Sequence, residues 1–172
     1  FVAPFDFSAS GVYECTAQVV VVDDSDNGND SFSKQIVSSP SITGFPYIQD
    51  FEAGSANWLI RGNTSFELGI PDAGNGVINT AASGSSAFVT NLDGEYSNNE
   101  AGWVESPCFN FALMDTPAIQ FSYIAEIEYY PAIPGFAFDG AYLEYSTDGG
   151  QAWIKVGAVG DTVNWYNFDN IW

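Results

Sequence analysis

Apolar and polar residues alternate along most of this chain, which is the period of two expected of half-buried β-strands. The clearest case is 141–145, where Ala, Leu and Tyr alternate with Tyr and Glu. Asp148, Gly149 and Gly150 follow, and the two glycines supply the positive-φ positions that a tight hairpin turn needs. The return strand is expected over 153–156. The sequence therefore predicts a β-hairpin near its C-terminal end.

The same alternation predicts a long first hairpin and a series of short strands. The first hairpin has strands at 11–22 and 31–37 around an acidic turn, and the short strands are expected over 57–61, 66–69, 86–90, 102–105 and 118–125. No stretch has a convincing period of 3.6, so helix should make up less than about a tenth of the chain. Many short strands with Gly- and Asn-rich turns favour an all-β fold, an antiparallel β-sandwich or jelly roll.

A domain boundary is expected at 38–44, where Ser, Pro and Gly interrupt the alternation. The hairpin before it resembles the last two strands of an immunoglobulin-like sandwich, so residues 1–40 are interpreted as the C-terminal strands of such a domain. A hairpin alone cannot bury its apolar face, so its partners are expected either upstream or on the second module. Residues 41–172 are interpreted as a jelly-roll domain, expected to be truncated at its C-terminus.

The hairpin turn at 146–153 resembles the Asp box, the Ser-x-Asp-x-Gly-x-Thr-Trp motif of sialidase propellers and reelin-type repeats. Ser146, Asp148, Gly150 and Trp153 match the motif, and Ala152 replaces its usual Thr. The Asp148 carboxylate can accept backbone N–H groups of its own turn, and Trp153 is expected to fold beneath the hairpin as an apolar plug. The resemblance implies a structural role away from any catalytic centre.

From residue 45 onward the order of signals resembles MAM-like and cleaved-adhesin modules of large secreted Bacteroidetes surface proteins, exported by type nine secretion. The resemblance is carried by segments 50–52, 86–96, 105–111 and 139–141, together with Trp58 and the Asp box. It implies an extracellular or bacterial cell-surface location with neighbouring β-sandwich modules as partners.

The same resemblance implies a calcium ion at the edge of the sandwich. By position its ligands would be Asp50, Glu52 and Asp139, with backbone carbonyls around 62–65 completing an oxygen shell. The alternative is that these acids are ordinary turn and strand-end residues. The acidic loop at 23–30 holds four carboxylates, but it lacks the spacing of a calcium loop and is interpreted as a solvated hairpin tip.

The net charge of the chain excludes some classes of function. The chain has 22 acidic residues, 3 basic residues and no histidine, giving a net charge of −19. Such a surface repels phosphate backbones and anionic lipids, so we expect neither nucleic-acid binding nor membrane insertion. A negatively charged surface can bind hard divalent cations such as calcium. The charge can equally serve only to keep the protein soluble. Cys15 and Cys108 lie in different segments, and two separate buried thiols are favoured over a bridge.

Catalysis is not expected. Without histidine, Ser–His triads and most general-base schemes are unavailable. Glu126 and Glu128 share a face of an extended segment, and a carboxylate pair at about 7 Å would suit an inverting glycosidase by distance alone. No other feature supports that reaction.

Two functions from different classes are favoured, and a passenger segment bound to secretion machinery or assembled into a fibre is a third possibility. The first is a non-catalytic, calcium-supported segment of a large secreted or cell-surface adhesin, used for adhesion, spacing or extracellular assembly. The second is a carbohydrate-binding accessory module of a secreted hydrolase or protease. Its glycan contacts would be aromatic, with Tyr129, Tyr130 and Trp165 as the preferred candidates and Trp58, Trp103 and Trp172 also available.

Overall fold

The computed structural model describes residues 4–9, 11–72, 78–128, 132–133, 136–161, 166 and 170–171. Its strands are β1 (Gly11–Gln18), β2 (Ser31–Ser38), β3 (Ser41–Ile42), β4 (Leu59–Asn63), β5 (Phe66–Gly69), β6 (Ala87–Thr90), β7 (Ala101–Glu105), β8 (Cys108–Phe109), β9 (Phe136–Ala137), β10 (Glu144–Tyr145), β11 (Ile154–Lys155) and β12 (Asn170–Ile171). The helical content of these residues is a single 3₁₀ turn, Asn27–Asn29. The prediction of an all-β chain is confirmed for this part of the protein.

The described strands pair two by two. Antiparallel pairs are β1–β2, β4–β7, β5–β6 and β10–β11, and parallel pairs are β3–β8 and β9–β12. The three longest pairs are all antiparallel, which confirms the predicted antiparallel pairing. The arrangement of a complete jelly roll stays a prediction.

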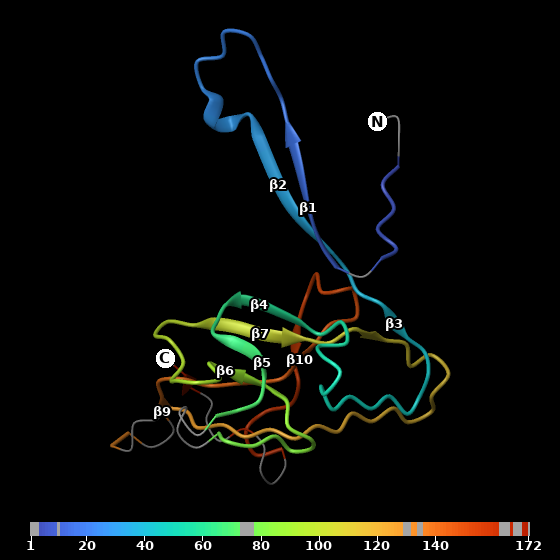
Figure 1. The fold of residues 1–172 in the computed structure, drawn as a ribbon, viewed down its shortest axis with the longest axis vertical. Helices are drawn as coiled ribbons and strands as arrows, with labels where there is room; N and C mark the ends of the chain where they lie inside the picture. Colours follow the sequence, from blue (N-terminus) through green and yellow to red (C-terminus); the bar gives the residue numbers. More distant parts are fainter. Residues whose placement is uncertain are drawn as a thin grey trace.

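The first hairpin projects away from the rest of the molecule (Figure 1). Its register runs from Gly11 opposite Ser38 to Gln18 opposite Ser31. The first strand was expected to continue to residue 22, but it ends at residue 18, where the Val19 N–H donates to the Asp30 carbonyl at 2.8 Å and the chain begins its turn.

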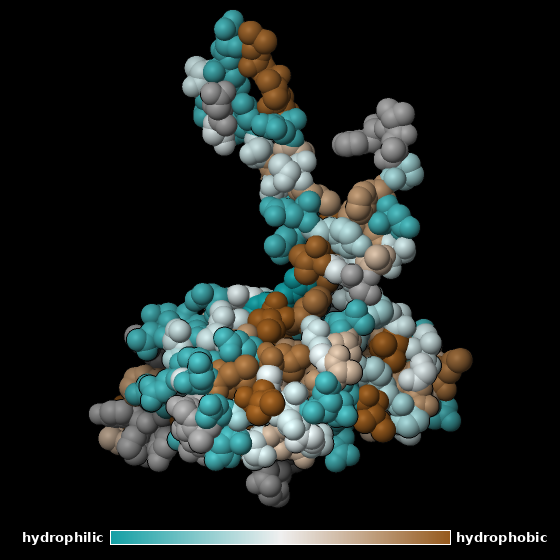
Figure 2. All heavy atoms as spheres, viewed as in Figure 1, coloured by the Kyte–Doolittle hydropathy of each residue, from teal (hydrophilic) through white to brown (hydrophobic). Residues whose placement is uncertain are grey.

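Exposed apolar side chains mark the outer end of this hairpin. The four valines at 19–22 are all exposed, and Figure 2 shows apolar atoms along one side of the tip. Phe32 on β2 is exposed as well. A two-stranded sheet has no second layer to cover such groups. The hairpin therefore presents apolar surface in this chain, and the predicted partner strands for it stay a prediction.

The segment predicted as a linker is tied to the body of the molecule. Within it, β3 pairs in parallel with β8, placing Ser41 opposite Cys108. The Cys108 N–H donates to the Pro40 carbonyl at 3.1 Å, and the Asn110 N–H donates to the Ile42 carbonyl at 2.9 Å. Composition alone could not show this, because a ladder satisfies backbone groups whatever the side chains are. Both cysteines are free, and Cys108 is exposed rather than buried.

The body is built around two short antiparallel pairs, β4–β7 and β5–β6 (Figure 1). Its most buried apolar side chains among the described residues include Val89 on β6, 4% exposed, and Ala137 on β9, 3% exposed. Pro107, between β7 and β8, is almost completely buried.

Aromatic rings form the packing around these strands. Phe51 contacts Trp58 at 5.5 Å and Phe88 at 5.0 Å between ring centroids, both edge-to-face. The Trp58 indole N–H donates to the Tyr47 hydroxyl at 3.2 Å. A second group continues from Tyr47 through Phe109 to Phe111 and Phe45. Edge-to-face pairs add about 0.5–1.5 kcal/mol each beyond the area that they bury.

One predicted strand is absent. Residues 118–125 alternate as a strand would, yet they belong to no strand, and Ile119, Phe121 and Ile124 are exposed. Alternation marks a chain that can pair, but a strand also needs a neighbouring backbone to pair with. Within the described ranges, no helix is long and apolar enough to cross a membrane.

Candidate functional site

The Asp-box turn is the most fully bonded site of the predicted set. Asp148 Oδ1 accepts the Ser146 hydroxyl at 2.7 Å and the backbone N–H groups of Gln151 and Ala152 at 2.9 and 3.0 Å. Ser146 Oγ in turn accepts the Gly150 N–H at 2.8 Å. These bonds to the ionised form, the Ala152 N–H first, lower the pKa of Asp148 below its ordinary value. The four residues of the motif therefore close the hairpin as a scaffold.

Glycine and tryptophan complete this turn. Gly149 and Gly150 have φ values of +75° and +84°, which a side chain would strain. A Cβ placed on Gly150 would lie 3.5 Å from Cζ2 of Trp153, so the indole packs directly against the turn. Trp153 nevertheless remains 38% exposed. It covers the hairpin as predicted but is not a buried plug.

The turn also meets the β4–β7 pair. Oε1 of Glu105, at the end of β7, lies 3.9 Å from the position of a Cβ on Gly150. The other oxygen, Oε2, accepts Nε of Arg61 from β4 at 3.3 Å. Both side chains are largely buried, 13% and 18% exposed, and Nη2 of Arg61 has no hydrogen-bond partner among the described residues. A largely buried ion pair thus joins β4 to β7 close to the Asp-box turn.

The three predicted calcium ligands each have an oxygen already bonded. Asp50 Oδ1 accepts the Glu52 N–H at 3.1 Å. Glu52 Oε1 accepts the N–H groups of Ser85 and Ser86 at 2.8 and 2.6 Å, which lower the pKa of Glu52. Asp139 Oδ2 accepts a hydrogen bond from another segment.

That segment is the loop before β7, where the Tyr96 hydroxyl donates to Asp139 at 2.7 Å. Among the described residues no group of three or more Asp, Glu, Cys or His side chains is placed to hold a metal ion. As arranged, the carboxylates of Asp50, Glu52 and Asp139 accept hydrogen bonds from backbone N–H groups and from a tyrosine hydroxyl. The calcium site stays a prediction.

Glu100 is a site residue that the sequence analysis missed. Its Oε2 accepts the Ser65 N–H at 2.9 Å and the Thr64 hydroxyl at 3.3 Å, and its Oε1 accepts the Ser97 N–H at 2.6 Å. Partial burial raises the pKa of Glu100, but the hydrogen bonds from Ser65, Ser97 and Thr64 outweigh it and lower the pKa to about 2. The Ser-x-x-Glu spacing of 97–100 is the signal that was available, because in that pattern the Glu reaches back to the Ser N–H.

The preferred glycan contacts, Tyr129, Tyr130 and Trp165, lie outside the described residues, as does Trp172. The other aromatic candidates divide by exposure. Trp58 is partly buried and packs against Phe51, whereas Trp103 on β7 is 48% exposed.

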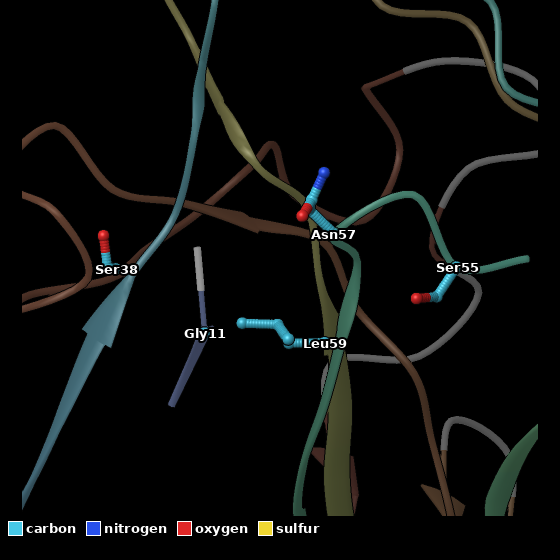
Figure 3. Close-up of a pocket in the computed structure, with 5 residues that line it drawn as sticks. All are labelled: Gly11, Ser38, Ser55, Asn57 and Leu59. Carbon is cyan, nitrogen blue, oxygen red and sulfur yellow. The ribbon is translucent and has the colours of Figure 1, made fainter. Parts of the chain in front are cut away.

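A small cavity lies where the first hairpin meets the body. It has a volume of about 180 Å³ and is lined by Gly11, Ser38, Ser55, Asn57 and Leu59. Figure 3 shows the Leu59 side chain extending from the start of β4 toward Gly11. Its lining carries hydroxyl and amide groups and no titratable side chain, so its chemistry is limited to hydrogen bonding and apolar contact.

No protein-family profile and no solved structure matches this chain. It is similar to Bacillopeptidase F of Bacillus subtilis (strain 168), with 31% identity over 132 residues. The aligned segment covers 76% of this chain and 8% of that protein. The likeness therefore concerns one module-sized part of a much longer chain, which its name describes as a peptidase.

Proposed function

We propose that this chain is a non-catalytic β-module of a large secreted or cell-surface protein, where it serves adhesion, spacing or extracellular assembly. The observation that carries the proposal is the partial likeness to Bacillopeptidase F, in which the matching segment is only 8% of the protein. A segment of that size suits an accessory module beside a catalytic domain. The absence of histidine also argues against catalysis by this chain through the common triads.

The finer architecture in this proposal comes from the resemblance to MAM-like and cleaved-adhesin modules. Residues 41–172 would be the jelly-roll module and residues 1–40 the end of an immunoglobulin-like one. The Asp-box bonds and the contact of Phe51 with Trp58 support it, because both join residues that carried the resemblance. The partners would be neighbouring β-sandwich modules outside the cell, and the exposed apolar hairpin offers surface for them.

A second candidate is a carbohydrate-binding accessory module of a secreted hydrolase or protease. It is favoured by a specific observation, the exposure of Trp103 and Trp153 on neighbouring parts of the body. Indole rings left open to solvent are the usual contacts for flat apolar faces of ligands.

The test of the accessory role uses Bacillopeptidase F itself. We expect that deleting its matching segment, or replacing it with this chain, leaves kcat/KM for a short soluble peptide unchanged. Retention of the enzyme on the producing cells should fall on deletion and return with the replacement. Loss of turnover in a correctly folded deletion variant would contradict an accessory role, as would hydrolysis of casein by this chain alone.

A further inference from the structure

Two exposed indoles flank the carboxylate of Glu105. Trp103 lies two residues before it on β7, and Trp153 immediately precedes β11. They are 48% and 38% exposed, whereas Trp58 is packed against Phe51. Both indoles belong to the exposed large apolar side chains of the described residues, and an aromatic ring of this size buries 150–250 Å² when it is covered. Their position around one polar group makes them the strongest candidate for a binding surface.

The strand register places this group on one face. Trp103 and Glu105 are two residues apart in β7, so their side chains point to the same side, about 7 Å apart along the strand. Arg61 is directly opposite Trp103 in the β4–β7 register and donates to Glu105 Oε2. All three side chains therefore belong to the same side of the strand pair.

The Asp-box hairpin closes the group from the other side. Gly150 is close to both groups, since a Cβ there would be 3.5 Å from Trp153 Cζ2 and 3.9 Å from Glu105 Oε1. The turn at Gly150 accordingly lies beside the end of β7. The scaffold formed by Asp148 holds the turn, and the turn holds Trp153 beside Glu105.

We propose that Trp103, Trp153 and Glu105 form a binding surface for a neutral, pyranose-based glycan. The apolar C–H face of a sugar ring stacks on each indole, and a sugar hydroxyl donates to Glu105 Oε1 while Arg61 holds Oε2. This inference rests on the carbohydrate-binding form of the proposed function. The glycan contacts would then be residues of the β4–β7 pair and the Asp-box hairpin rather than Tyr129, Tyr130 and Trp165.

Charge selects the class of glycan. The chain carries −19, so uronate-rich or sulfated polysaccharides are repelled. Of its three cations, Arg61 is paired with Glu105, the Lys155 ammonium lies 5.7 Å from the centre of the Tyr166 ring, and Lys34 is on the projecting hairpin. An acidic sugar would find the Arg61 guanidinium bonded to Glu105 through Nε and its Nη2 buried, whereas a neutral sugar needs only stacking and hydroxyl donors.

Affinity electrophoresis tests this proposal with three soluble neutral polysaccharides in the gel: hydroxyethyl cellulose, laminarin and mannan, with alginate as the anionic comparison. We expect at least one neutral polymer, and not alginate, to retard the chain. Trp103→Ala and Trp153→Ala should each weaken that retardation about tenfold or more in apparent Kd. Trp103→Phe, which keeps an aromatic face, should weaken it less than Trp103→Ala.

Phe32→Ala is the matched control, because Phe32 is an exposed aromatic residue on the distant hairpin. It should leave retardation unchanged. Near-ultraviolet circular dichroism checks that each variant is folded. Lack of retardation by all three neutral polymers would overturn the glycan site while leaving an accessory role in Bacillopeptidase F untouched, because that role is read from cell retention. Equal retardation of the folded Trp103→Ala variant and the parent chain would also overturn it.

Discussion

Several carboxylates in this molecule accept hydrogen bonds from backbone N–H groups of nearby turns. Glu52 accepts two such groups from the 85–86 loop, Asp148 accepts two in its own hairpin, and Glu100 accepts two from separate segments. The bonds lower the pKa of all three groups, because each N–H favours the ionised form. At the residue scale, part of the high acidic content thus organises loops while it also contributes to the negative surface charge.

Glu100→Gln tests this use of a carboxylate. At pH 7 we expect it to lower the free energy of unfolding by about 1–2 kcal/mol, a figure reduced for solvent screening at this half-exposed position. The folded-state pKa of about 2 lies below the ordinary 4.5. The stabilisation is therefore complete above pH 4.5 and is lost as the pH falls toward 2. Urea unfolding curves of parent and variant across this range measure it.

Glu95→Gln serves as the control, because Glu95 is an exposed acid in the same loop. It should change the free energy of unfolding by less than about 0.5 kcal/mol. A difference between Glu100→Gln and the parent chain that stays the same at pH 2.5 and pH 7 would contradict the assignment, because the effect would then not depend on ionisation of Glu100.

At the scale of elements, two glycines let β4 and β7 approach closely. Gly62 and Gly102 are opposite each other in the register, and Gly62 has φ of +80°. A Cβ on Gly62 would collide with the Ala101 carbonyl and touch the Trp103 ring. The pair that positions Arg61, Trp103 and Glu105 therefore depends on the absence of a side chain at this point.

Gly62→Ala should lower the free energy of unfolding by about 2 kcal/mol or more, since it adds a backbone collision to the strain of positive φ. Gly149 has a similar φ but open space around it. Gly149→Ala therefore introduces the backbone strain without the collision, and it should lower the free energy of unfolding by less. Thermal unfolding compares the two. An equal loss in both variants would mean that the close approach of β4 and β7 contributes nothing.

Local interactions were predictable from the sequence, and long-range ones were not. The Asp-box bonds join residues at most four positions apart, so the motif contained the information needed to place them. The contact of Glu100 with Ser65 spans 35 positions and depends on how β4, β5 and β7 are arranged. The alternation of side chains located most strands, but it could not show that 118–125 would belong to no strand or that β3 would pair with β8.

At the scale of the whole molecule, the net charge of −19 makes divalent cations the ions to test. If calcium binds at Asp50, Glu52 and Asp139, excess calcium stabilises the fold by RT ln(1 + [Ca]/Kd). We expect the thermal midpoint to be higher in calcium than in magnesium at equal ionic strength, and the difference to vanish in Asp139→Asn. Differential scanning fluorimetry with a chelator as reference measures it.

Magnesium is the necessary control, because any divalent cation screens so acidic a surface. Equal midpoints in calcium, in magnesium and after complete chelation would contradict the calcium prediction. In that case Glu52 and Asp139 would be read as the acceptors that the structure shows, for Ser85, Ser86 and Tyr96.

The scarcity of basic side chains also limits where a trypsin-like protease can cut this molecule. Only the peptide bonds after Lys34, Arg61 and Lys155 qualify, and these residues belong to β2, β4 and β11. Lys34 and Lys155 are exposed, whereas Arg61 is held against Glu105. Each cleavage product therefore reports the opening of a different strand pair, and the order in which the products appear gives the order in which the fold comes apart.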